Sequence, residues 1–557
     1  LAPLGTAGDP TLTVHLQGAT ASGVEGEHHA EVRVNGTAVG EVRWEGTAAQ
    51  SATFAVPAGL LTETGNQVEI AGQLDSGVPF SILYFDSLEL TYPRSFRATG
   101  DALAVRAAEP ADIAVTGFST AAISLVEITD PQRPRWVQGA AAGPDLAGAS
   151  TFRLGFRPAF REARYLAATR AGAKAAELAP WQLAGLRSPG QHTDVLIVTT
   201  AALAPAAERL AAHRRSQGLE AQVVDMAAVA DEFGFGVATP HALRALLSYA
   251  WQSWQKAPRY VVLAGNGTLD YRGLLGLGGN LVPPLMVQSP GGLFASDNRL
   301  ADVAGEDGVP EMAIGRIPVS TAAELDAYVD KVIAYENGDG SPGADWVNRA
   351  VLLADTPDRG ADFSAVSERL AGLLPSGYDP ERIYLSQTPF AQARGQLFQA
   401  LAQGASLISY VGHGGLDRLT AEGLLASADV PGLSNRDHLP VLTALTCTVN
   451  RFGVPGVPPL GEVLVKSPNG GAAAVWAPSG LSIHGEAGLL AERFYRRLSN
   501  PSPDRLGDLI IQSLQEFKSL GGDFSMLEIY NLLGDPAFRL RRATGSVPVG
   551  PGVASRE

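Results

Sequence analysis

The sequence is almost devoid of cysteine: Cys447 is the only one in 557 residues. A single thiol cannot close an intrachain disulfide, and it lacks the companion cysteines that a zinc cluster needs. The fold is therefore expected to form without disulfide cross-links. What remains for Cys447 is a role as a small buried residue or as a nucleophile.

Other absences exclude whole classes of protein. The net charge is -15 and there is no long basic run, which argues against nucleic-acid binding. No apolar stretch has transmembrane length. A Walker A loop and an HExxH motif are missing, and Gly265-Asn-Gly267 lacks the rest of a dinucleotide fingerprint. The sequence begins Leu1-Ala-Pro without an initiator Met, and it shows no signal peptide. We therefore expect a processed chain from which a secretion signal has been removed.

A chain of 557 residues is expected to form about two to four domains, and hydrophobic residues, at 45%, are abundant enough for their cores. Residues 1–92 alternate apolar and polar side chains, with a hairpin signal at Asn35-Gly36, and predict a β sandwich or jelly roll. Residues 93–188 continue as a second β-rich region, which is either another sandwich or the other half of the first. Residues 543–557 predict a flexible tail.

From residue 189 to residue 542 the pattern changes to short buried strands that alternate with helical segments. This alternation predicts an α/β domain with a mostly parallel sheet and helices on both faces. The expected strands are 194–199, 221–224, 260–264, 350–354, 407–411, 441–445 and 472–476. Ligands bind at the carboxyl ends of such strands. His413 and Cys447 each lie just past one of these ends.

This position favours a nucleophile for Cys447, with His413 as the base that activates it. Glycines on both sides of His413 let the backbone turn sharply. The N–H groups of Gly414 and Cys447 are candidate oxyanion donors, and Asp355, directly after a strand, is the candidate that holds the imidazole. Each residue also has a simpler interpretation. Cys447 could be a buried core residue, His413 part of an ordinary glycine-containing turn, and Asp355 the cap of the next helix.

The segment Ser479-Gly-Leu-Ser-Ile-His484 follows another predicted strand. We expect it to line the substrate cleft, with Ser479 and His484 as substrate-binding residues.

Six stretches of the α/β region carry a resemblance to a known family: Asp231-Glu-Phe-Gly-Phe-Gly236, Tyr260-Val-Val-Leu-Ala-Gly-Asn-Gly267, Ala313-Ile-Gly-Arg-Ile-Pro318, Ser409-Tyr-Val-Gly-His-Gly414, Leu445-Thr-Cys447 and Asn531-Leu-Leu-Gly-Asp-Pro-Ala537. With these stretches, residues from about 190 to 542 resemble the gingipain-type cysteine peptidases of family C25, whose catalytic domain is caspase-like. The segment 113–136 also resembles the β region that precedes this domain in such proteins.

The resemblance implies that His413 and Cys447 form a catalytic dyad with backbone donors at Gly414 and Cys447. Asp355 falls where gingipains carry a glutamate that supports the histidine. It also implies a bacterial protein that is secreted, periplasmic or at the cell surface.

The resemblance further implies a site for a basic substrate side chain. Asp362 lies near the acidic residue that selects a basic P1 side chain in the arginine-specific members, and Asp358 is its competitor. An acidic pocket would favour Arg or Lys. In the alternative interpretation, both carboxylates only cap the helix that starts near Phe363.

No cofactor is expected to be required, although gingipain-like domains can bind calcium. Asp297, Asp302 and Asp307 lie in an acidic loop that offers oxygen ligands, without EF-hand spacing. A solvated acidic loop is the alternative interpretation.

The sequence therefore predicts a cysteine endopeptidase that acts on proteins or peptides through a thioester acyl-enzyme. A sortase-like transpeptidase would use the same dyad and pass the acyl group to an amine. A third hypothesis is a binding or adhesion protein in which the α/β domain is an inactive scaffold.

Overall fold

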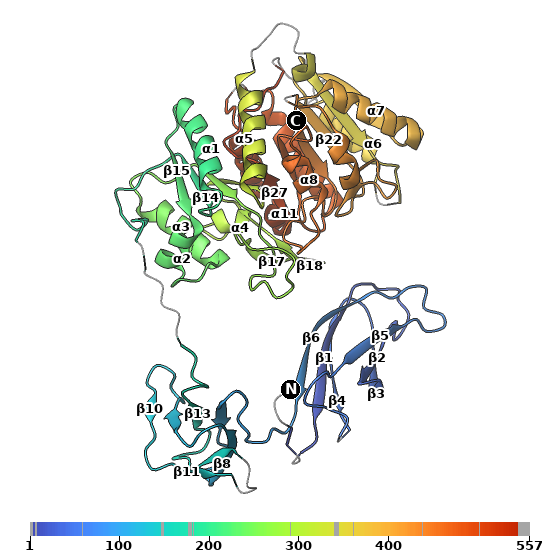
Figure 1. The fold of residues 1–557 in the computed structure, drawn as a ribbon. Helices are drawn as coiled ribbons and strands as arrows, with labels where there is room; N and C mark the ends of the chain where they lie inside the picture. Colours follow the sequence, from blue (N-terminus) through green and yellow to red (C-terminus); the bar gives the residue numbers. More distant parts are fainter. Residues whose placement is uncertain are drawn as a thin grey trace, which may run out of the picture. The chain divides into compact units, whose positions relative to one another are not determined.

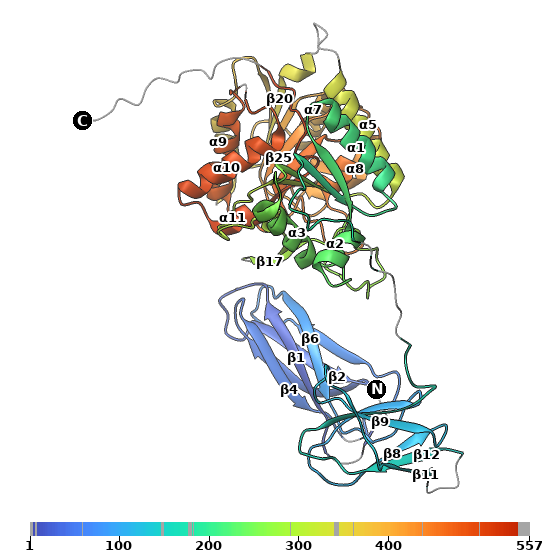
Figure 2. The same ribbon diagram turned by 90° about the vertical axis from the view of Figure 1, so that its left-hand side faces the viewer.

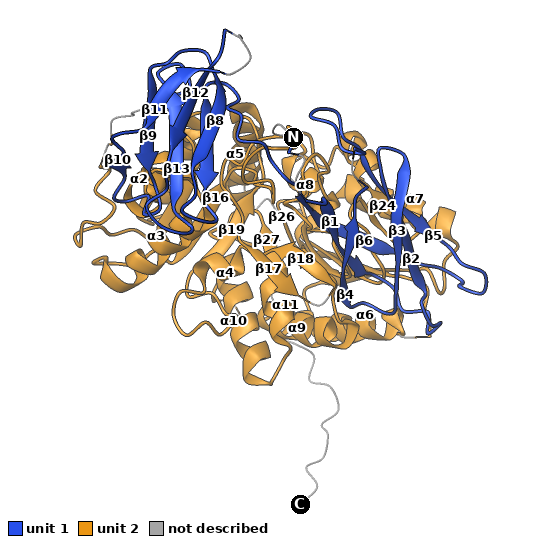
Figure 3. Ribbon diagram, turned by 90° about the horizontal axis from the view of Figure 1, so that it is seen from below, with its two compact units in different colours: residues 1–179 blue, residues 180–557 orange. Residues whose placement is uncertain are grey.

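The computed structural model describes residues 4–5, 8–57, 59–145, 150–175, 181, 183–289, 291–338, 345–359, 361–436, 438–500 and 502–543. The chain divides into two compact units, residues 1–179 and 180–557 (Figures 1 and 3). This division falls a few residues before the predicted start of the α/β domain at residue 189. Apart from Ala543, the predicted tail over 543–557 lies outside the described residues.

The first unit contains two separate pairs of antiparallel sheets. In residues 11–91, β1 (Thr11–Gly18) pairs with β4 (Ala49–Ala55) and β6 (Leu83–Thr91), and β2 (His28–Val34) pairs with β3 (Thr37–Trp44) and β5 (Val68–Gln73). Alternate residues of β1 are buried, as a strand with one face on a core requires. The β2–β3 turn is the predicted hairpin at Asn35-Gly36, and both residues have positive φ.

The strands of residues 102–169 form the second pair of sheets. One has the order β10-β9-β13-β7 and the other the order β11-β12-β8. Their bounds are β7 (Ala102–Arg106), β8 (Ile113–Phe118), β9 (Ile123–Glu127), β10 (Arg135–Trp136), β11 (Ala141–Pro144), β12 (Phe152–Phe156) and β13 (Arg164–Thr169). These strands pair with one another and enclose a core of their own, so the β-rich region is not the other half of the first sheet pair.

The second unit is built on one ten-stranded sheet with the order β15-β14-β16-β19-β27-β26-β25-β22-β20-β21. The strands are β14 (Val195–Thr199), β15 (Ala221–Asp225), β16 (Tyr260–Ala264), β19 (Ala313–Ile317), β20 (Arg349–Ala354), β21 (Asp379–Tyr384), β22 (Leu407–Val411), β25 (Val441–Leu445), β26 (Ala474–Pro478) and β27 (Tyr530–Leu533). Neighbours are parallel everywhere except at β26–β27. The prediction of a mostly parallel sheet is confirmed, and the sheet consists of two parallel halves that run in opposite directions.

Helices cover both faces of this sheet, as predicted (Figure 2). Across one face lie α1 (Ala204–Ser216), α5 (Ala322–Asn337) and α8 (Leu460–Lys466), and across the other lie α6 (Phe363–Ala371), α9 (His484–Arg497) and α10 (Leu506–Ser519). The remaining helices are α2 (Met226–Phe233), α3 (Pro240–Ser253), α4 (Asn298–Ala301), α7 (Phe390–Gln403) and α11 (Phe524–Ile529). In the described part of the chain, no helix combines the length and apolar character needed to cross a membrane.

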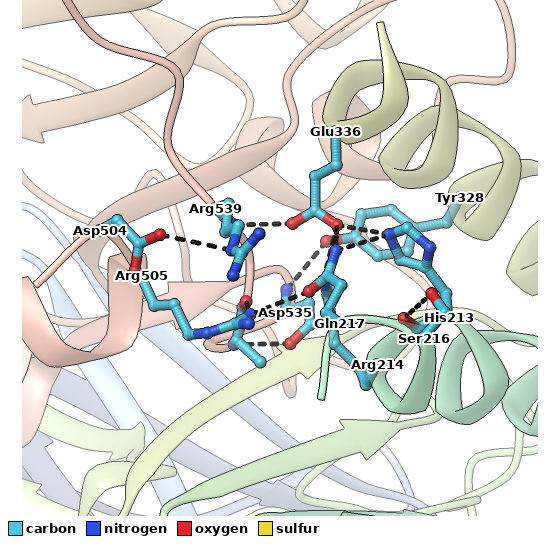
Figure 4. Close-up of polar contacts among 11 residues, drawn as sticks. His213, Arg214, Ser216, Gln217, Tyr328, Glu336, Asp504, Arg505, Asp535 and Arg539 are labelled. Atoms are coloured by element: carbon cyan, nitrogen blue, oxygen red, sulfur yellow. Dashed lines mark hydrogen bonds and ion pairs between the residues drawn. The ribbon is translucent and has the colours of Figure 1, made fainter. Parts of the chain in front are cut away.

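A buried ionic network ties α1 and α5 to the segment that follows β27 (Figure 4). The fully buried guanidinium of Arg214 donates to Asp535 at 2.7 and 2.9 Å and to Glu336 at 2.6 Å. Burial alone would raise the pKa of Glu336, but His213 and Arg214 together lower that pKa to about 2. The backbone N–H of Asp535 donates to the Tyr328 hydroxyl at 2.8 Å. Arg214 therefore has two carboxylates in direct contact.

Replacing Arg214 tests how far the fold depends on this network. Arg214→Met leaves two buried carboxylates without their cation, and we expect the free energy of unfolding to fall by about 3–5 kcal/mol. Arg209 on the same helix pairs with Asp326 and Asp330, but its side chain is 45% exposed. Arg209→Met should therefore cost less than about 1 kcal/mol. Urea unfolding of both variants measures the difference, and equal losses would contradict the prediction.

Candidate functional site

Strand register brings the predicted catalytic residues to one edge of the sheet. β22 and β25 are adjacent and parallel, with Val411 opposite Leu445. His413 and Cys447 are each the second residue after that pair, and the Gly412 N–H donates to the Leu445 carbonyl at 3.2 Å. β20 lies on the other side of β22, with its last residue, Ala354, opposite Val411. Asp355, the next residue, therefore lies at the same edge of the sheet as His413 and Cys447.

Asp355 holds the backbone of the turn that carries His413. One carboxylate oxygen accepts the His413 backbone N–H at 3.1 Å and lies 3.3 Å from the Tyr410 hydroxyl. The other oxygen accepts the N–H of Thr356 at 2.7 Å. Burial and the Asp355 charge raise the pKa of Tyr410, which keeps its phenol protonated. A Cβ at Gly412 would overlap that of Asp355, so this position requires glycine.

The imidazole of His413 contacts a different carboxylate from the one predicted. Its Nε2 lies 2.8 Å from Oδ2 of Asp358, and the side chains are 65% and 42% exposed. The ring of Phe363 packs edge-on against the imidazole at 5.3 Å between centroids. Asp355 was predicted to hold the ring, but it is buried beneath the turn and reaches only the backbone of His413 in the contacts described above.

The segment after β26 supplies a contact to the thiol that the sequence did not identify. The backbone N–H of Ser482 donates to Sγ of Cys447 at 3.5 Å. Next to the cysteine, Thr448 has a positive φ of 52° and donates its N–H to the Gly480 carbonyl at 3.0 Å. The only signal in the sequence was that residues 479–484 follow a strand next to that of Cys447.

Ser479 and His484, the two residues predicted to bind substrate, have different environments. Ser479 is fully buried, and its hydroxyl donates to the Ala295 carbonyl at 2.6 Å and accepts from Asn531 at 3.1 Å. Its side chain therefore stabilises the interior and does not face the cleft. His484 begins α9 and packs edge-on against the Phe363 ring that also contacts His413. Burial, Arg369 and His413 lower the pKa of His484, and Asp358 partly offsets this.

The carboxylate of Asp362 caps α6 by accepting the Ala365 N–H at 3.0 Å. This is the helix-capping role that the sequence left open, and the side chain of Asp362 is still exposed to solvent. Gly414, the predicted oxyanion donor, packs closely against the residue that precedes Cys447, because a Cβ at Gly414 would overlap Oγ1 of Thr446. The roles of the Gly414 and Cys447 N–H groups in catalysis stay a prediction.

The structure does not bring Asp297, Asp302 and Asp307 together as metal ligands. Among the described residues, no group of three or more His, Cys, Asp or Glu side chains is arranged to hold a metal ion. Each carboxylate instead pairs with its own cation, which is Arg316 for Asp297, Arg299 for Asp302 and Lys518 for Asp307. A bound cation at these side chains would have to displace those pairs.

The two carboxylates near His413 should differ in what they stabilise. Asp355→Asn replaces an acceptor by a donor at a buried site where three donors converge, so we expect the free energy of unfolding to fall by about 1–3 kcal/mol. Asp358→Asn alters an exposed side chain and should change it by no more than about 0.5 kcal/mol. Chemical denaturation of the two variants measures both values. A larger loss for Asp358→Asn than for Asp355→Asn would reverse the assignment.

Similar proteins are found by sequence and by structure. Gingipain R2 of Porphyromonas gingivalis is 22% identical over 325 residues, which cover 55% of this chain and 41% of that protein. The crystal structure of the Arg-specific cysteine proteinase gingipain R has a TM-score of 0.54 at 18% identity and covers 66% of this chain and 81% of its own. The dimeric latent PorU structure from P. gingivalis has a TM-score of 0.50 at 16% identity and covers 97% of this chain and 49% of its own.

These structural similarities show that the second unit has the gingipain fold, while the chain spans less than half the length of gingipain R2. Residues 188–541 match the sequence family described as peptidase family C25. That match covers well over half of the chain and the whole ten-stranded sheet. The predicted resemblance is thus confirmed, and the chain belongs to peptidase family C25.

Proposed function

We propose that this chain is a cysteine endopeptidase that cleaves peptide bonds through His413 and Cys447. The main support is the register of β22 and β25, which carries both residues to neighbouring positions just past the carboxyl ends of adjacent parallel strands. The family membership and the buried Asp355, which fixes the backbone of His413, agree with this proposal. The substrates are proteins or peptides, and we propose that the enzyme is exported, as expected from the sequence.

In the first half of the reaction, His413 takes the proton from Sγ of Cys447, and the thiolate attacks the carbonyl carbon of the scissile bond. The carbonyl oxygen becomes an oxyanion that accepts hydrogen bonds from the N–H groups of Gly414 and Cys447. When the C–N bond breaks, His413 returns the proton to the leaving amine. The acyl group is then held as a thioester on Cys447.

In the second half, His413 takes a proton from a water molecule, which attacks the thioester carbonyl. The C–S bond breaks, the peptide leaves as a carboxylic acid and the thiol is regenerated. In the transpeptidase alternative, an amine replaces this water and the product is a new amide. Asp358 supports both routes, because a carboxylate 2.8 Å from Nε2 stabilises the imidazolium that forms in each half.

The dyad is tested by labelling with acyloxymethyl ketone probes that carry Arg, Lys, Asp or Leu at P1. Cys447 is the only cysteine, so intact mass reports its modification without ambiguity. We expect labelling to disappear in Cys447→Ala and in His413→Ala. His192→Ala is the matched control, because this exposed histidine precedes β14, distant in sequence from both dyad residues, and it should label normally. A His413→Ala variant that labels like the wild type would contradict the dyad.

Product analysis of a cleaved peptide, with and without an added primary amine, separates the two outcomes of the thioester. Hydrolysis gives a mass increase of one water shared between the fragments. Transfer gives an amide that contains the added amine, and it would favour the transpeptidase over the endopeptidase.

We also propose a preference for Arg or Lys at P1. The support is that Asp358 contacts His413 and that Asp362, whose side chain is exposed, directly precedes Phe363, whose ring packs against His413. A cationic side chain would pair with such carboxylates. Asp362→Asn tests this sharply, since Asn is as good an N-cap as Asp and the helix should persist. We expect the ratio of kcat/KM for Arg over Leu substrates to fall by roughly tenfold or more. An unchanged ratio would remove Asp362 from the specificity site.

A further inference from the structure

The segment that leaves β26 directs a backbone donor at the sulfur of Cys447. Pro478 ends the strand, and four residues later the N–H of Ser482 lies 3.5 Å from Sγ. The structure gives the thiol this amide contact in addition to its position beside His413. A hydrogen bond to an ionised acceptor is roughly twice as strong as one to a neutral acceptor. The Ser482 amide therefore interacts more strongly with the sulfur once the sulfur carries a negative charge.

A buried phenol holds Ser482 in place. The Ser482 hydroxyl lies 3.1 Å from the hydroxyl of Tyr530 and 4.0 Å from Sδ of Met526. Tyr530 is the first residue of β27 and is almost fully buried, with its ring edge-on to Trp476 at 5.8 Å. Burial raises the pKa of Tyr530, so its phenol stays neutral beside an anionic sulfur. The side chain of Ser482 is thus attached to the sheet itself.

The start of the same segment is fixed independently. The Ser479 N–H donates to the Ile529 carbonyl at 2.8 Å, and the Gly480 carbonyl accepts from Thr448. A Cβ at Gly480 would lie 2.9 Å from Cγ2 of Ile529 and 3.0 Å from the Phe294 ring, so only glycine fits without a shift. Ser479 and Ser482 are tied to β27 and the residue before it, and Gly480 is tied to Thr448, so the direction of the Ser482 N–H is set before any substrate binds.

We propose that the Ser482 N–H stabilises the nucleophilic sulfur of Cys447 and that Tyr530 is the positioning residue that aims it. The role rests on the proposed cysteine peptidase activity. Tyr530, from β27, interacts electrostatically with Cys447, and His413, at the end of β22, is the base of the proposed dyad. His413 removes the thiol proton, and the Ser482 amide offsets the charge left on sulfur until the C–S bond forms.

Alkylation of Cys447 by iodoacetamide tests this inference without any peptide substrate, and intact mass gives the rate. Tyr530→Phe and Ser482→Ala each remove the hydroxyl contact, and we expect each to slow alkylation by about threefold to tenfold, the worth of one net hydrogen bond. Ser482→Thr keeps a hydroxyl and should restore most of the rate. The Tyr530→Phe/Ser482→Ala double variant should be no slower than either single one, because both break the same link.

Tyr328→Phe is the matched control. It removes another buried phenol hydroxyl of the same unit, which accepts from Asp535 and belongs to the ionic network in Figure 4. Its alkylation rate should equal that of the wild type. The inference is overturned if Tyr530→Phe and Ser482→Ala alkylate at the wild-type rate, or if their losses multiply in the double variant. If the wild type cleaves no peptide while Tyr530→Phe and Ser482→Ala still slow alkylation, the proposed activity is refuted but the role of the Ser482 contact stands.

Discussion

The ten-stranded sheet of the second unit depends on its one antiparallel pairing, between β26 and β27. Five parallel strands lie on each side of it and run in opposite directions, so this pairing alone joins the two halves of the sheet. The side chain of Asn531 reinforces it. Its oxygen accepts the Asp297 N–H at 2.9 Å, and its nitrogen donates to the Ile529 carbonyl at 2.8 Å and to the Ser479 hydroxyl. A buried amide with its hydrogen-bonding groups satisfied fixes one arrangement of the surrounding backbone.

The two ends of β27 then do different things. Its first residue, Tyr530, pairs with Pro478 at the edge where Cys447 lies, and its hydroxyl meets Ser482. The segment after its last residue, Leu533, leads to Asp535, which pairs with the buried Arg214 of α1. Buried ion pairs of this kind contribute little net stability, but breaking one is costly. These ion pairs therefore help to fix the position of β27. The position of β27 in turn fixes residues 479–482, which contact Cys447.

The sequence was sufficient to predict the strands that carry the site, because buried strands next to glycines have a strong local pattern. His413 and Cys447 follow from that pattern together with the rule that parallel strands share their carboxyl ends. The antiparallel direction of β27 could not be predicted, since Tyr530–Leu533 is short and buried on both faces like the parallel strands. The partners of Asp355, Asp358 and Ser479 could not be predicted either. They depend on the irregular backbone that follows β20 and β26, and the local sequence pattern does not fix its path.

At His413 the site combines a firmly held backbone with an exposed imidazole ring. Asp355 is buried and sets where the His413 backbone lies, whereas the His413 imidazole and Asp358 are largely in water. A histidine–carboxylate contact so exposed contributes less than about 1 kcal/mol in the free protein. A peptide bound over Cys447 would exclude water from the pair, and the same 2.8 Å contact would then act in a lower dielectric. In the proposed mechanism, folding fixes the backbone of His413, and a bound substrate would strengthen the Asp358 contact that orients the imidazole ring.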